Sequence, residues 1–112
     1  MKPIDVITNH FSSQETKRIE VPEWADTEGK PLVILADPLT VAEKGKFFKM
    51  AKDDDLSLLV YALIFKAKDE QGNKMFTLAD KKALMEKSDP DVVARVANEI
   101  MKSKTTEEQL GN

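Results

Sequence analysis

The sequence predicts an α+β fold in which an N-terminal β-hairpin is followed by about four helices. In the first third of the chain, two short segments with strand-like patterns flank a turn, which is the arrangement of a hairpin. From residue 40 onward, capping residues precede stretches that have the spacing of helices. The 112 residues suffice for one domain, so we expect a single domain over residues 1–102 and a disordered polar tail over residues 103–112.

The predicted hairpin begins with residues 16–24, in which polar and apolar side chains alternate with the period of a strand. Pro22 lacks an amide donor, which limits this strand to a sheet edge or a strand end. A turn that contains Gly29 leads into the apolar segment 31–37. Because a lone hairpin is marginally stable in water, its apolar face has to pack on the rest of the domain or on a neighbour. For residues 1–14, a short helix and a strap across the core remain open as alternatives.

Each helix predicted after the hairpin has a capping signal at its start. Thr40 and Glu43 have the spacing of a capping box, in which each side chain accepts a hydrogen bond from the other residue's backbone amide. The acidic residues 53–55 favour the start of a second helix, because helix N-termini attract negative charge. Pro90 follows Asp89 and suits the first position of the last helix. The expected helices span about residues 40–52, 56–68, 77–87 and 90–102.

A turn at residues 69–74 separates the second and third predicted helices. We expect Gly72 or Asn73 to adopt a positive φ in this turn. Thr77 and Asp80 then resemble a second capping box at the start of the third helix.

The predicted second helix is apolar on every side. At about 100° per residue, Leu56, Leu59, Val60, Leu63 and Ile64 fill one side, and Leu58, Tyr61, Ala62 and Phe65 fill the opposite one. Such a helix has to be covered all round, and two interpretations remain open, which can both be partly true. It is the central helix of the domain, or one side forms an oligomer or partner surface, because monomers seldom leave large apolar patches in water. The candidate interface residues are Phe47, Met50, Leu58, Tyr61 and Phe65.

Composition argues against several classes of function. The formal net charge of -3, from 17 basic and 20 acidic residues, leaves no basic stripe, so we expect no binding to nucleic acid. The chain has no cysteine and therefore no disulfide framework or thiolate chemistry. No run approaches the roughly 20 apolar residues of a membrane helix, and the N-terminal segment lacks the apolar core of a signal peptide. We expect a soluble, cytoplasmic protein that does not bind membranes.

The residues that could carry chemistry do not form a known motif. His10 is the only histidine, and without cysteine one chain cannot build a histidine-based zinc cluster or a His-paired thiolate. The acidic residues 53–55 are better explained as a helix cap than as a cation site, which needs ligands from several positions. Gly45 and Gly72 lie in contexts that match neither a phosphate-binding loop nor an EF-hand. We therefore expect no metal site, no cofactor and no enzymatic activity.

The order of the elements and particular residues resemble a known family. The segment "DPLTVAEK" precedes a helix, an acidic break and an apolar helix, and "KDEQGNKMFTLADKKALMEKSDPDVVARVANEIM" follows. The features that carry the resemblance are Asp69, Gly72, Phe76, Asp80, Leu84, Asp89, Pro90, Val93, Val96 and Ile100. This pattern, over about residues 20–101, resembles the small tail assembly chaperones of long-tailed bacteriophages. None of these residues is a catalytic signature.

The resemblance implies a non-enzymatic assembly factor in the host cytoplasm. Such a protein binds the long helical tape-measure protein, keeps it soluble, helps to recruit tail-tube subunits, and is absent from the finished virion. The resemblance also implies a homo-oligomer and a longer form made by ribosomal frameshifting, for which residues 105–112 are the point of attachment. A chaperone of apolar helices needs an apolar groove or a self-associating ring or spiral, to which Leu58, Tyr61 and Phe65 would contribute.

Two other functions remain as alternatives. The protein could be a structural head-tail connector or tail-completion protein that stays in the virion. It could also be a host-directed regulator that binds a protein or DNA, although its composition argues against DNA.

Overall fold

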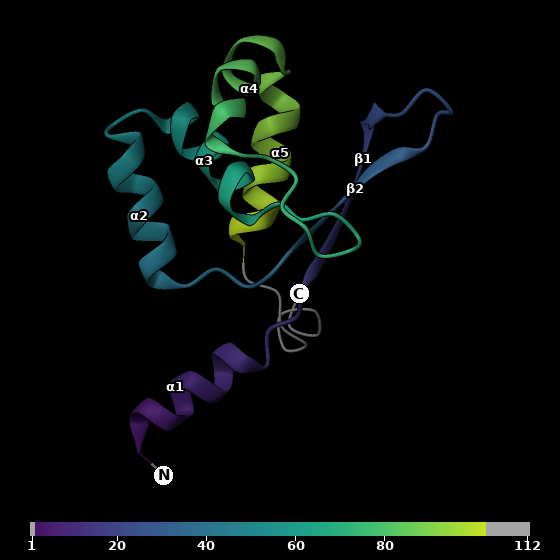
Figure 1. Ribbon diagram of the computed structural model, residues 1–112. Coiled ribbons are helices and arrows are strands. Elements are labelled where there is room, and N and C mark those ends of the chain that lie inside the picture. Colours follow the sequence, from purple (N-terminus) through teal and green to yellow (C-terminus); the bar gives the residue numbers. More distant parts are fainter. Residues whose placement is uncertain (1, 103–112) are drawn as a thin grey trace.

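The computed structural model describes residues 2–102 and has a hairpin beside a group of helices (Figure 1). The elements are α1 (Pro3–Ser12), β1 (Lys17–Ala25), β2 (Pro31–Ala36), α2 (Val41–Ala51), α3 (Asp55–Lys66), the 3-10 turn η1 (Leu78–Asp80), α4 (Lys81–Lys87) and α5 (Pro90–Met101). The predicted α+β class is confirmed, and so are the hairpin and the helices after it. Two alternatives were open for residues 1–14, and within them Pro3–Ser12 form helix α1. The tail predicted over residues 103–112 lies outside the described residues.

The helix starts follow the local capping chemistry. In α2, the hydroxyl of Thr40 accepts from the amide of Glu43, and the Glu43 carboxylate accepts from the amide of Thr40, both at 3.0 Å. The Asp54 carboxylate caps α3 by accepting from the amide of Leu56 at 3.1 Å. Asp89 caps α5, with Pro90 at the first helical position. These contacts confirm the predicted starts, because a cap depends on residues that are close in the sequence.

The hairpin strands pair antiparallel, with Ile19 opposite Ile34. The register shifts between Val21 and Ala25, where Pro22 interrupts the ladder, which is consistent with the missing amide of proline. On the outer edge of β2, Leu35 exchanges two backbone hydrogen bonds with Lys68, at 2.8 and 2.9 Å. The residues after α3 therefore extend the sheet locally and join the hairpin to the helical part.

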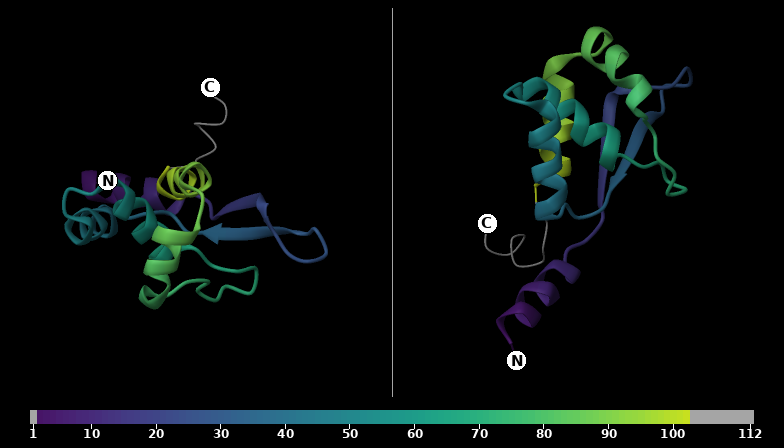
Figure 2. Two further views of the ribbon diagram at one scale, coloured as in Figure 1. Left: turned by 90° about the horizontal axis from the view of Figure 1, so that it is seen from above. Right: turned by 60° about the vertical axis from the view of Figure 1, so that its left-hand side comes forward.

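Helix α3 lies at the centre of the helical part and packs against α2, α4 and α5 (Figures 1 and 2). Its buried side chains join the hairpin residues Val21 and Ile34 in one core cluster. The predicted inner face of α5 is buried in full and consists of Val92, Val93, Val96, Ala97 and Ile100. These contacts confirm that α3 is the central helix of the domain.

Two buried lysines join elements that are distant in the sequence. The ammonium group of Lys17 in β1 donates to the carbonyls of Glu99 and Ile100, at the last turn of α5, where a cation is favourable. Lys66 at the end of α3 donates to both carboxylate oxygens of Glu43 at 3.1 Å and to the carbonyl of Pro38 at 3.3 Å. These bonds fix the start of α2 against the end of α3.

Helix α1 projects away from the rest of the molecule (Figures 1 and 2). None of its ten residues is buried. Within residues 2–102, no helix combines the length and the apolar character that crossing a bilayer requires.

Candidate functional site

The aromatic residues predicted as an interface form a stack between α2 and α3. The rings of Phe47 and Phe65 are nearly parallel, with centroids 5.7 Å apart, and the rings of Tyr61 and Phe65 are 6.3 Å apart. Phe47 is 1% exposed and Tyr61 7%, so both belong to the core of the monomer. Phe65, Met50 and Leu58 are half-buried against that core. The structure thus brings the three aromatic residues together, while their role as a partner surface stays a prediction.

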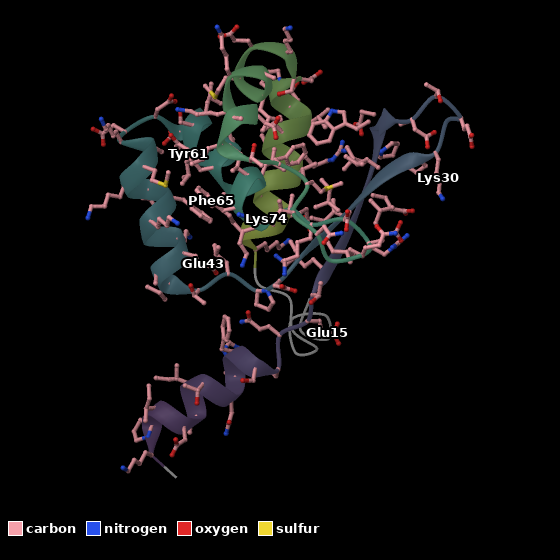
Figure 3. The ribbon with its side chains drawn as sticks, in the orientation of Figure 1. Glu15, Lys30, Glu43, Tyr61, Phe65 and Lys74 are labelled. Carbon is pink, nitrogen blue, oxygen red and sulfur yellow. The ribbon has the colours of Figure 1, made fainter. Side chains whose placement is uncertain are left out.

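Three lysine side chains, from α2, from the turn after α3 and from α4, lie over the rings of this stack. The ammonium groups of Lys46 in α2 and Lys74 in the turn after α3 lie 4.4 and 5.2 Å from the Phe65 ring centre. Lys81 of α4 lies 4.9 Å from the centre of the Tyr61 ring. Figure 3 shows Lys74 beside Phe65, with Tyr61 one turn earlier in α3. A cation over a ring contributes roughly 0.5–1 kcal/mol at an exposed site, so a partner would first have to displace these lysines.

A groove lined mainly by apolar side chains lies where α3, α4 and α5 meet, and we call it the α3–α4–α5 groove. Its volume is about 240 Å³, and it is lined by Leu56, Leu59, Val60, Leu84, Met85, Ser88, Pro90 and Val93. Leu56 is 55% exposed and Met85 39%. No lysine lies among its lining residues. The exposed apolar lining could receive an apolar side chain of another molecule.

The sequence builds this groove from short, tightly capped segments. Helix α4 has only seven residues and is followed by Ser88, whose hydroxyl donates to the carbonyl of Leu84. Pro90 fixes the next helix start directly after it. Two adjacent side chains on a helix point about 100° apart, so Leu84 and Met85 cannot both face the core of so small a domain.

Hydrogen bonds at the start of α3 lower the pKa of Asp54, the carboxylate that caps this helix. The Ser57 hydroxyl donates to Asp54 at 2.6 Å, and this bond lowers the pKa of Asp54 below its ordinary value. Backbone amides of Ser57 and Leu56 and the nearby charge of Lys81 act in the same direction. Asp54 thus keeps its negative charge at neutral pH and fixes the first turn of α3 beside the groove.

Two further depressions lie on the surface. One, of about 310 Å³, is lined by Phe48, Ala51, Leu58 and residues 52–55, and the Phe48 side chain is 53% exposed. The other, of about 400 Å³, lies beside the hairpin and includes Trp24 and Met75 among acidic and polar residues. Both mix apolar and charged groups more evenly than the α3–α4–α5 groove.

Helix α1 carries a further exposed apolar surface. Ile4, Ile7 and Phe11 have the spacing of one helix face and are 58%, 62% and 38% exposed. We call these three residues the α1 stripe. Val6, on the far side of the helix, is 55% exposed. The sequence pattern did not decide between a helix and a strap here, so it gave no prediction of this stripe.

Metal binding and similarity to known proteins give no further indication of function. Within residues 2–102, no three His, Asp or Glu side chains gather in a way that could hold a metal ion. Comparisons with protein-family models, with curated proteins and with solved structures gave no match.

Proposed function

We propose that this protein is a non-enzymatic assembly chaperone that binds apolar helical segments of a client. The observation that carries the proposal is the α3–α4–α5 groove, in which Leu56 and Met85 are exposed. Amphipathic helices bind such grooves by inserting apolar side chains spaced three or four residues apart. Methionine suits a site that accepts varied clients, because its side chain is flexible and adapts its shape.

The resemblance of residues 20–101 to phage tail assembly chaperones suggests which client this is. In that proposal the client is the tape-measure protein, tail-tube subunits are a further partner, and the protein acts in the host cytoplasm. A tape-measure protein is a long helix with many apolar segments, so several copies of the chaperone could bind along it.

The size of the groove favours weak and reversible binding at each site. Every apolar client side chain that becomes fully buried contributes about 1.5–3 kcal/mol. Ordering the client segment and restricting two molecules cost much of this gain. A chaperone that releases its client during assembly needs such moderate affinity, and multiple binding along one client supplies the required total affinity.

Co-expression with the long helical protein encoded by a neighbouring gene tests the proposal. We expect the client to remain soluble and to co-elute with this protein. Mass spectrometry of purified virions provides a second test, because a chaperone is expected to be missing from them. Two results together would instead identify a structural component: the client precipitates even when this protein is present, and this protein is found in purified virions.

A further inference from the structure

The outer edge of β2, on the side away from β1, is only partly paired. On this side the backbone amide and carbonyl of Leu35 bond to Lys68, at 2.8 and 2.9 Å. In an antiparallel sheet these directions repeat at every second residue, so the amide and the carbonyl of Val33 face the same side. Within residues 2–102, no backbone hydrogen bond or isolated bridge pairs these two groups. Val33 therefore offers one donor and one acceptor to a further strand.

The chain turns away at the point where it would pair with Val33. Because Lys68 lies opposite Leu35, the position opposite Val33 falls at Glu70 in the same antiparallel register. The amide of Gly72 donates to the carbonyl of Asp69 at 2.9 Å and closes a turn there. Figures 1 and 2 show this turn and the hairpin projecting on the same side of the molecule. The place of a strand beside Val33 is therefore left open.

A pocket of about 400 Å³ lies at this place, and we call it the β2-edge pocket. Val33 lines it, together with Trp24 and Leu32 of the hairpin and Met75 after the turn. The last three side chains are partly buried and pack against the core, so the core holds this apolar wall in place. Side chains of an added strand alternate between its two faces, and those of one face can contact such a wall.

Carboxylates outnumber cations around the β2-edge pocket. Its lining includes Asp26, Asp69 and Glu70, with Lys30 as the basic residue among them. Glu70 pairs with Arg18 at 2.9 Å on the exposed surface. Asp26 and Asp69 each accept two amides of their own turns through Oδ1, and neither forms an ion pair within residues 2–102. This excess of negative charge favours a basic ligand.

We infer that the β2-edge pocket binds a short, extended segment of another protein, in which an apolar side chain is flanked by lysine or arginine. The segment pairs with Val33 as an added strand and places its apolar side chain against Trp24 and Met75. Its cations interact with Asp26 and Asp69. In this mode of recognition the backbone bonds give affinity and the side chains give specificity. A helical segment would not satisfy Val33, because the backbone groups of a helix are already bonded to each other.

The charge of the pocket also argues against a second copy of this chain as the occupant. Pairing of two identical β2 edges would bring the same carboxylates together, and charged residues at a strand edge oppose such pairing. A basic segment meets no such repulsion.

The β2-edge pocket is separate from the α3–α4–α5 groove. The two share no lining residue. The groove accepts apolar side chains of a helix, whereas the pocket accepts a strand through its backbone as well. The protein can therefore hold two different segments at once, and binding at the β2-edge pocket does not rest on the proposed function.

Fluorescence anisotropy with a labelled peptide tests the inference on the full chain. The probe is Thr-Lys-Thr-Lys-Leu-Lys-Thr-Lys-Thr, in which threonine favours the extended form and one leucine lies between lysines. We expect saturable binding of this peptide. Affinity should be at least about tenfold lower when glutamate replaces every lysine, and also when serine replaces the leucine. Absence of binding by the lysine peptide overturns the inference, and so does equal binding of the lysine and glutamate peptides.

Variants of the protein locate the bound peptide. Val33→Pro removes the outward amide and leaves the ladder with β1 in place, so it should weaken binding at least about tenfold. Glu70→Lys reverses a charge of the lining and should weaken binding as well. Glu86→Lys on α4 is the matched control for net charge and should bind like the unmodified chain. Leu56→Asp in the α3–α4–α5 groove should also bind normally. A loss with Leu56→Asp but not with Val33→Pro would place the peptide in the groove and overturn this inference alone.

Hydrogen exchange followed by NMR examines the same contact without any substitution. Saturating lysine peptide should slow exchange of the Val33 amide at least about tenfold, because a hydrogen-bonded amide exchanges only when its bond opens. Exchange of the Ile7 amide in α1 should not change. Unchanged exchange of Val33 with the peptide bound overturns the inference, because binding would then not use the edge of β2.

Discussion

Substitution of Phe47 by alanine should remove a large part of the stability of the domain. The Phe47 side chain is 1% exposed and stacks on Phe65 at 5.7 Å, so its removal leaves a cavity between α2 and α3. Replacing a buried phenylalanine by alanine costs about 3–5 kcal/mol, out of a total free energy of unfolding of about 5–15 kcal/mol for a domain. With a urea slope of about 1–3 kcal/mol per molar, the unfolding midpoint should fall by 1 M or more, about 2 M at the middle of these ranges.

Urea titration followed by circular dichroism measures this change, and the next residue provides the control. Phe48 is 53% exposed, so Phe48→Ala should cost less than about 1 kcal/mol. The comparison also tests whether Phe47 belongs to the core or to a partner surface. Equal small losses for the two variants would refute the assignment of Phe47 to the core. In that case the prediction from sequence, that Phe47 faces a partner, would become the better explanation.

Two other predictions concern local contacts. Thr40→Ala removes the cap of α2, at a cost of about 1 kcal/mol in urea titration, whereas Thr27→Ala in the hairpin loop should cost much less; equal losses would contradict the capping role. The Arg95 guanidinium donates two hydrogen bonds to the Glu23 carboxylate, at 2.6 and 2.7 Å, and these bonds, with one from the backbone amide of Glu23, lower the pKa of Glu23 from 4.5 to about 2. The resulting stability is present above pH 4.5 and is lost as the pH falls toward 2, so Arg95→Met should flatten the decrease of the urea midpoint over that interval. An unchanged decrease would show that this ion pair does not contribute to acid unfolding.

The features predicted best from the sequence depend on residues that are near neighbours in the chain. The capping box of Thr40 and Glu43 and the cap of Asp89 before Pro90 were identified because their geometry depends on four consecutive residues or fewer. The inner face of α5 followed from its period, since an amphipathic helix shows its buried side directly. The pairing of Leu35 with Lys68 was missed, because a single bridge between distant segments leaves no periodic pattern.

The candidate groove was missed for a different reason. The helical positions of Leu56 and Leu59 placed them on the side assigned to the core, but a helical wheel does not show where neighbouring helices end. The first turn of α3 stays partly uncovered beside the short α4. How far one helix covers another depends on the angle between them, which the sequence pattern does not show. The adjacent apolar pair Leu84 and Met85 was the available signal. Conversely, the lysines over Phe65 and Tyr61 come from three elements, so the sequence alone could not show that this aromatic side is covered.

The most direct test of the proposed function compares two leucine variants in co-expression with the helical client. Leu56 lines the groove and Leu78 lies outside it, and the two side chains are 55% and 54% exposed. Both lie in the first turn of their helical segments, where aspartate is tolerated, so Leu56→Asp and Leu78→Asp should fold equally well. The account predicts that the unmodified chain and Leu78→Asp keep the client soluble, while Leu56→Asp leaves it in the pellet. Equal rescue by both variants would contradict client binding in the α3–α4–α5 groove.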